Sequence, residues 1–148
     1  VQNHFSLLCR VSEKEGILDY CRSRGIDFFA YMVLEQGALS GKYSADHPMP
    51  AESRRGQVYN PLLPQIQPLI NAMREVGAAH GASASQVGIA WAIVKGAIPI
   101  IGATRPEQIQ DIAKAAAVRL TAADRSMLEQ TAAAIDVDTR GTWEHAMR

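Results

Sequence analysis

The sequence is poor in cysteine and has no excess of charge of either sign. Its 148 residues include only two cysteines, Cys9 and Cys21, which provide neither a disulfide framework nor the spacing of a zinc site. We expect both thiols to be reduced core residues. The 15 basic and 15 acidic residues balance, so no net field attracts nucleic acid or an anionic membrane surface. Nucleic acid and membrane are therefore not expected as partners.

Long apolar runs and metal-ligand spacings are also missing. No apolar run approaches the ~20 residues of a membrane span, and the N-terminus lacks the regions of a signal peptide. We therefore expect a cytoplasmic protein. The four histidines have no partner at the i, i+4 spacing and no acidic residue at ligand spacing, so no metal site is expected. They are His4, His47, His80 and His145.

The residues that are present suit one packed α/β domain. Hydrophobic residues make up 47% of the chain, and its length fits one domain, residues 1–148, on a prior of ~100–200 residues per domain. Apolar runs at residues 1–8, 26–34 and 97–101 predict strands that alternate with helices. This order predicts a parallel sheet, either doubly wound or part of a (β/α)8 barrel. The doubly wound alternative lacks its Gly-x-Gly-x-x-Gly fingerprint.

Several polar pairs and glycines predict helix boundaries. Three pairs have the spacing of a capping box: Ser12 with Glu15, Ser83 with Gln86, and Thr121 with Asp124. Helical periodicity assigns Trp91, Met127 and Leu128 to the core. Residues 44–68 hold five prolines and predict a long loop of the kind that forms lids, and residues 137–148 predict an irregular tail.

Residues 97–112, AIPIIGATRPEQIQDI, combine a strand, a tight turn and a helix start. The apolar run breaks at Gly102, and Pro106 occupies the first helical position, which its fixed φ suits. Unpaired N–H groups in a first helical turn favour an anion. Arg105 adds a planar, permanently charged group that suits phosphate. A solvated surface turn is, however, the more common cause of this pattern.

A second glycine-bearing loop follows the preceding strand. Residues 35–43, EQGALSGKY, place Gly37 and Gly41 four residues apart, with Lys42 directly after them. Glycines let the backbone approach a ligand closely and a lysine donates to phosphate, although plain glycine loops show the same pattern. In a barrel, phosphates commonly bind at the loops after the last two strands. The two loops together therefore favour the barrel.

Four segments carry a family resemblance: VQNHFSLLCR, YCRSRGIDFFAYMVLEQGALSGKY, SASQVGIAWAIVKGAIPIIGATRPEQI and VDTRGTWE. In order and spacing they are similar to the C-terminal half of an aldo-keto reductase, an NADP(H)-dependent oxidoreductase. The resemblance covers nearly the whole chain. It implies a (β/α)8 TIM barrel of which this chain forms parallel strands six to eight with their helices. It also implies reduction of aldehydes or ketones, with this chain supplying the cofactor-binding half.

The resemblance further implies contacts with NADP(H). Gln2 matches the family's glutamine that hydrogen-bonds the nicotinamide carboxamide, and Tyr31 matches the aromatic residue that stacks on the nicotinamide ring. The loop around the pyrophosphate corresponds to Leu34, Gln36, Gly37, Leu39, Gly41 and Lys42. The turn at the adenosine 2′-phosphate and the contacts after it correspond to Ile101, Gly102, Ala103, Thr104, Arg105, Gln108 and Asp111. Arg105 favours NADP over NAD.

The chain departs from the family's pattern at several positions. Met32 and Val33 stand where Ser-Pro is usual, and His4 replaces an acid or amide without an evident reason. Ile112 replaces an asparagine, and since isoleucine cannot hydrogen-bond an adenine amine, we expect it to pack against the base. The family's catalytic aspartate, tyrosine, lysine and histidine belong to its first half. No catalytic residue is therefore assigned, and we expect this chain to be part of a longer polypeptide.

Two other functions stay open. A half barrel with exposed strand edges and an exposed apolar face could pair with itself or with another chain as a non-catalytic nucleotide-binding or interaction module. A different barrel enzyme could bind a phosphorylated metabolite at the same turn. In the leading interpretation the partners are a small carbonyl substrate and the missing N-terminal half or a second copy. Residues 44–68 and Trp143 are candidates for the substrate wall.

Overall fold

Three short parallel strands form the single sheet of the described chain. The computed structural model describes residues 1–145, with the backbone only of Thr142 and Trp143. The strands are β1 (Gln2–His4), β2 (Phe29–Tyr31) and β3 (Ile98–Pro99), in the spatial order β1–β2–β3 with both pairs parallel. Parallel neighbours joined by helices are typical of α/β proteins. The predicted α/β class is confirmed.

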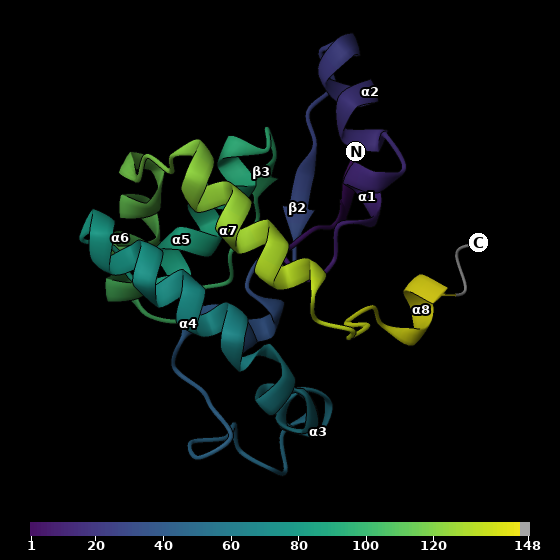
Figure 1. Cartoon of the computed structure of the whole chain (residues 1–148). Coiled ribbons are helices and arrows are strands. Elements are labelled where there is room, and N and C mark those ends of the chain that lie inside the picture. Colours follow the sequence, from purple (N-terminus) through teal and green to yellow (C-terminus); the bar gives the residue numbers. More distant parts are fainter. Residues whose placement is uncertain (146–148) are drawn as a thin grey trace.

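Helix α4 packs against both α5 and α7, and α5 packs against β3 (Figure 1). The helices are α1 (Val11–Lys14), α2 (Ile17–Arg24), α3 (Arg54–Tyr59), α4 (Leu63–His80), α5 (Ala84–Val94), α6 (Pro106–Lys114), α7 (Ala122–Ala133) and α8 (Thr142–His145). Three 3₁₀ segments are η1 (Glu35–Ser40), η2 (Asn60–Leu62) and η3 (Ala115–Ala117). None of the helices in residues 1–145 combines the length and apolarity needed to cross a membrane.

Two of the three predicted capping boxes are confirmed. At the start of α5, Ser83 Oγ accepts from the Gln86 backbone N–H and the Gln86 side chain reaches back to the Ser83 N–H. Thr121 and Asp124 make the same reciprocal pair at the start of α7. These boxes satisfy N–H groups that would otherwise lack a partner at the helix ends. The spacing therefore located both helix starts correctly.

The capping box predicted at Ser12 is wrong. The Ser12 side chain is buried, and its hydroxyl accepts a hydrogen bond from Asn3 Nδ2 on β1. The predicted single helix is divided at Gly16, whose φ of +76° is left-handed and ends the first turn. The Ser12 side chain faces the core and contacts β1, so it does not cap the helix. The local spacing could not reveal that contact.

The core lies between one face of the sheet and α5. Trp91 of α5 is fully buried and stacks on Phe5 with ring centroids 5.0 Å apart, while Phe28 meets Phe5 edge-on. The prediction that Trp91 fills the core is confirmed. In α7 Leu128 is buried as predicted, but Met127 is 37% exposed, so its assignment to the core is wrong. Adjacent helical positions point about 100° apart, and only one of the two faces the core.

The opposite face of the sheet is uncovered in the described chain. Gln2, Phe29 and Ile98 form one row across the three strands, and all three are exposed. Ala30, which follows Phe29, points the other way and is fully buried, as the two-residue period of a strand requires. The prediction that the second strand is covered on both faces is therefore wrong for this chain. An apolar row on this face is typical of positions inside a barrel.

Residues 44–68 contain helices where a loop was predicted. Ser53 Oγ accepts from the Gly56 N–H and caps α3, and α4 already begins at Leu63. Proline is compatible with a first helical turn, and Pro64 lies there. The tail also contains α8, so the prediction of an irregular tail is wrong in part. The Trp143 side chain lies outside the described residues, and with it the predicted contact with substrate.

Candidate functional site

The segment after β2 reverses direction through a run of left-handed backbone. Gly37 and Gly41 have φ values of +99° and +76°, which glycine adopts without strain. Met32, Glu35 and Gln36 also have positive φ, between +48° and +59°. Left-handed backbone at non-glycine residues is strained and is often retained at binding sites. The sequence did not predict this strain.

Helices α4 and α5 hold the loop after β2 through hydrogen bonds to its carbonyl groups. Arg74 Nη2 of α4 donates to the Gly41 carbonyl at 2.6 Å, and Ser85 Oγ of α5 donates to the Ser40 carbonyl at 3.2 Å. The Leu39 side chain is fully buried beneath the loop. Two helices and one buried side chain therefore fix the path of the backbone between β2 and the long excursion that follows.

The turn after β3 is organised around Gln108. Its Oε1 accepts from the backbone N–H groups of Thr104 and Arg105, at 2.8 and 3.1 Å, and from Thr104 Oγ1 at 3.2 Å. The first residue of α6 is Pro106, as predicted. Gln108 thus binds the N–H groups of the two residues that directly precede the first helical turn, where the sequence predicted an anion. The exposed Arg105 side chain stands beside them.

The two loops line one cleft with a volume of about 980 Å³. Of the predicted cofactor residues, eleven lie along it: Leu34, Gln36, Gly37, Lys42, Ile101, Gly102, Ala103, Thr104, Arg105, Gln108 and Asp111. The departures Met32, Val33 and Ile112 lie along it as well. Since both loops follow neighbouring parallel strands, they meet at the carboxyl ends of the sheet, where ligands bind in α/β folds.

Four predicted residues lie elsewhere. Leu39 is buried under the loop, and Gly41 contributes its backbone to the loop rather than a surface to the cleft. Gln2 lies on the uncovered face of the sheet and is exposed. Tyr31 ends β2 immediately before the cleft residue Met32, and its hydroxyl donates to Glu144 Oε1 at 2.8 Å. The structure therefore separates the residues assigned to the phosphates from those assigned to the nicotinamide.

Arg55 and Tyr43 line the cleft but were not predicted. Arg55 of α3 lies over the Tyr43 ring at 5.8 Å and donates to its hydroxyl at 3.4 Å, and Lys42 lies 5.4 Å from the centre of the same ring. With Arg105, the cleft carries three cationic side chains. The only signal in the sequence was the pair of arginines at positions 54 and 55, which is too short to count as a basic tract.

A buried carboxylate, Glu35, joins β1, α3 and the tail at the base of the same loop. It is fully buried and accepts hydrogen bonds from four side chains. His4 Nε2 lies at 2.9 Å, Tyr59 OH at 3.0 Å and Thr139 Oγ1 at 3.1 Å, and Ser6 Oγ is the fourth donor. Buried charges are stable only when paired and hydrogen-bonded. Glu35 therefore connects residues of β1, α3 and the tail, and its own backbone is one of those with positive φ.

His4 links this carboxylate to the tail. Its Nδ1 lies 3.1 Å from Glu144 Oε1, and its ring stacks on Tyr31 with centroids 5.7 Å apart. Burial alone would lower the pKa of His4, but interactions with Cys9 and with the Glu35 carboxylate outweigh burial and raise the pKa to about 11. Burial and the bond to Glu144 raise the pKa of the Tyr31 phenol. At neutral pH His4 is therefore a buried cation between two carboxylates.

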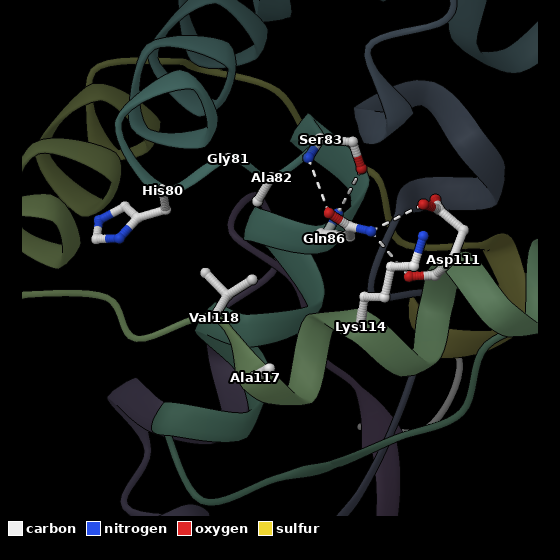
Figure 2. A pocket seen from close by; sticks show the side chains of 9 residues that line it. All are labelled: His80, Gly81, Ala82, Ser83, Gln86, Asp111, Lys114, Ala117 and Val118. Carbon is white, nitrogen blue, oxygen red and sulfur yellow. Dashed lines mark hydrogen bonds between the residues drawn. The ribbon is translucent and has the colours of Figure 1, made fainter.

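A smaller, polar hollow of about 430 Å³ lies behind the cleft, between the start of α5 and α6 (Figure 2). Gln86 and Asp111 meet there, and Asp111 borders both this hollow and the cleft. His80, at its rim, is bound through Nε2 to Asp124 at 2.9 Å. The hollow therefore borders α6, the helix that follows the turn with Arg105.

A parallel α/β sheet with paired loops around one cleft at its carboxyl ends is the arrangement found in part of a β/α barrel. The sequence profile described as "Aldo/keto reductase family" matches residues 1–133. The chain belongs to that family. The resemblance inferred from its sequence segments is thereby confirmed.

The curated relatives are longer proteins. The chain is 34% identical over 131 residues to a chloroplastic pyridoxal reductase from Arabidopsis thaliana, covering 88% of this chain and 35% of that protein. It is 27% identical over 140 residues to an NADH-specific methylglyoxal reductase from Escherichia coli, covering 92% of this chain and 42% of that protein. The chain thus spans about a third to two fifths of their length.

Solved structures support the fold. The glycerol dehydrogenase AKR11B4 from Gluconobacter oxydans superposes with a TM-score of 0.79 at 21% identity, over 95% of this chain and 45% of that one. A thermostable aldo-keto reductase, Tm1743, gives a TM-score of 0.64 at 21% identity, over 88% and 38%. These similarities concern the fold alone, and the described strands correspond to part of a (β/α)8 barrel.

Proposed function

We propose that the protein is an oxidoreductase that reduces aldehydes or ketones with NADPH, and that this chain supplies the cofactor-binding half. The observation that carries the proposal is the single cleft between the loop after β2 and the turn after β3, with Arg105 at its edge. Family membership supports the reaction class. A cytoplasmic location, suited to the two free cysteines, is part of the same proposal.

The proposed contacts divide the cofactor between the two loops. The backbone at Gly37 and the Lys42 ammonium line the cleft and would bind the pyrophosphate, and the Arg105 guanidinium would bind the 2′-phosphate. Ile112 lines the cleft as well and would pack against the adenine. Tyr31 and Gln2 remain the proposed contacts of the nicotinamide, which supplies the hydride when the cofactor is bound. One dinucleotide thus bridges the carboxyl ends of β2 and β3.

Gln108 adds a consequence for phosphate binding. Its Oε1 accepts from the N–H groups of Thr104 and Arg105, as a phosphate oxygen would. A phosphate oxygen that binds these two N–H groups would therefore require the Gln108 carboxamide to rotate or to share them. The Arg105 guanidinium needs no such change, because it is exposed beside the turn.

The preference for NADPH rests on Arg105 rather than on the relatives. One relative is named as NADH-specific, so family membership leaves both nucleotides possible. A permanently charged, planar guanidinium at the turn discriminates a phosphorylated ribose from an unphosphorylated one by charge-assisted hydrogen bonds. We therefore assign the discrimination to this side chain.

The remaining groups for carbonyl reduction are proposed to come from outside this chain. Hydride transfer to an unactivated carbonyl needs a general acid, and none is assigned here. The proposed partners are the carbonyl substrate and either the N-terminal half of the barrel or a second copy. The exposed row of Gln2, Phe29 and Ile98 supports such a partner, because it lies on the face that a barrel closes over.

Calorimetric titration of the full-length polypeptide with NADPH and NADH tests the proposal. Charge-assisted hydrogen bonds contribute about 1.5–3 kcal/mol each, so Arg105→Ala should weaken NADPH binding roughly 10- to 100-fold and leave NADH nearly unchanged. Arg119→Ala is the matched control, because Arg119 is also exposed and, among residues 1–145, donates only to the nearby Ala116 carbonyl. Equal binding of both nucleotides by the unaltered protein would refute the assignment.

A non-catalytic interaction module is the second candidate. The uncovered apolar row of the sheet, including Phe29 and Ile98, favours it. Sedimentation of this 148-residue chain distinguishes the two candidates. A well-folded dimer that binds NADPH but does not support carbonyl reduction would favour the module.

A further inference from the structure

The Gln86 side chain connects the start of α5 with the middle of α6. It is only 6% exposed. Its Oε1 accepts from the Ser83 N–H at 3.0 Å, and its Nε2 donates to the Asp111 carbonyl at 2.9 Å and to Asp111 Oδ1 at 2.8 Å (Figure 2). The carboxamide therefore uses both of its amide hydrogens on one residue of the neighbouring helix. This pair goes beyond the capping box that the sequence predicted.

Helix α6 is held by this polar contact in addition to one partly buried apolar residue, Ile112, which packs against the core. None of the residues of α6 is fully buried, and Ile109 is 61% exposed. Helices are usually fixed by an apolar stripe packed into a core. Here a buried polar side chain binds α6 through Asp111, and the same residue borders the nucleotide cleft. The orientation of α6 also sets the position of the turn that precedes it.

We propose that Gln86 is a positioning residue of the nucleotide cleft. By holding Asp111, it fixes α6 against α5 and so sets the place of Arg105 and the turn before α6. This inference rests on the proposed function, because it assigns Gln86 to the adenosine end of the same cleft. Gln86 itself lines the hollow behind α6 and does not line the cleft.

Position 86 requires a side chain that both accepts and donates hydrogen bonds. The side chain has to accept from the Ser83 N–H with one atom and donate to Asp111 with the other, and a carboxamide does both. Gln86→Glu keeps the acceptor and the shape, but it places a carboxylate oxygen against Asp111 Oδ1. The hydrogen bonds between position 86 and Asp111, here called the clamp, are then lost. The acceptor for the Ser83 N–H is kept. Asp111→Asn in the same protein supplies an amide donor and re-forms the hydrogen bond with its direction reversed.

The test compares these variants in the full-length polypeptide. The probes are adenosine 2′,5′-bisphosphate, which reports on the adenosine end alone, and NADPH in steady-state turnover. Ser83→Ala is the matched control, because it removes the cap acceptor at the same helix start and leaves the Gln86–Asp111 contact intact. Hydrogen exchange of α6 amides in the free protein measures the clamp directly, and exchange in α4 and α7 reports whether each variant is folded.

We expect Gln86→Glu to raise the dissociation constant of adenosine 2′,5′-bisphosphate and the KM for NADPH about tenfold, the loss of one charge-assisted hydrogen bond. The kcat at saturating NADPH stays within twofold, and α6 amides exchange faster. Gln86→Glu with Asp111→Asn binds the bisphosphate as tightly as Asp111→Asn alone. Ser83→Ala lowers the urea midpoint and leaves the dissociation constant within twofold.

Unchanged binding by Gln86→Glu would overturn the positioning role while leaving the proposed function intact. Weak binding without recovery in the double variant would also overturn it, because the clamp would not be the cause. If the unaltered protein binds neither NADPH nor the bisphosphate, the proposed function fails and the positioning role fails with it. The two failures are therefore distinguishable by the unaltered protein alone.

Discussion

Replacement of Glu35 by alanine should be among the most damaging single changes in the chain. The carboxylate accepts from His4 Nε2, Ser6 Oγ, Tyr59 OH and Thr139 Oγ1, and it is fully buried. Alanine removes all four acceptor contacts at once. It also leaves the protonated His4 with one carboxylate partner in place of two.

The expected loss follows from the buried charge. Removing one partner of a buried ion pair typically costs about 3–5 kcal/mol. The three hydroxyl groups add to this loss where they fail to find new acceptors, at roughly 0.5–1.5 kcal/mol per hydrogen bond. The positive φ of residue 35 remains unfavourable for alanine, so no backbone strain is relieved. We therefore expect Glu35→Ala to lose at least about 3–5 kcal/mol, a large part of the ~5–15 kcal/mol of a typical domain.

Urea unfolding followed by the fluorescence of the buried Trp91 measures this loss. Glu35→Gln keeps the volume and one acceptor oxygen, so it should lose less than alanine, about 1.5–3 kcal/mol. The exposed Glu52→Ala is the control and should change stability by less than about 0.5 kcal/mol. If Glu35→Ala loses under about 1 kcal/mol at an unchanged urea dependence, the reasoning from the buried cluster is refuted.

Three further predictions concern stability and pH. The pKa of His4 rises from 6.5 to about 11 on folding. The pairing of His4 therefore stabilises the fold fully below pH 6.5, and this stabilisation is lost as the pH rises toward 11. The urea midpoint should fall over this window, and it should fall less in His4→Gln. Gly41→Ala should lower the free energy of unfolding by about 1–2 kcal/mol, because φ is +76° and the new carbon would lie 3.0 Å from a neighbouring side-chain carbon. Gly102→Ala is the control and should not lower it, because the space around Gly102 is open. Thr121→Ala should lose about 1 kcal/mol by thermal unfolding, since the hydroxyl caps α7.

Local patterns predicted the starts of α5, α6 and α7 and the two loops of the cleft. Ser83 and Thr121 cap their helices through contacts three residues away, so sequence spacing contains the whole interaction. The strand-to-helix turn at Arg105 is equally local. The pairing of the two loops followed from the rule that neighbouring parallel strands end at the same edge of the sheet.

The buried polar cluster and Arg55 could not be predicted in this way. Glu35 meets Thr139, 104 residues later in the chain, and His4 meets Glu144, 140 residues later. No spacing rule joins residues at such separations. Arg55 reaches the cleft because residues 44–68 form helix α3 and the start of α4, which their proline content obscured. Long-range packing decided each of these features.

The central claim is that the loop after β2 and the turn after β3 bind one phosphorylated dinucleotide between them. A crystal structure of the full-length polypeptide with NADPH tests it most directly. We predict the pyrophosphate against Gly37 and Lys42, and the 2′-phosphate within hydrogen-bond distance of the Arg105 guanidinium, in one continuous ligand. A nucleotide bound away from either loop would contradict the claim.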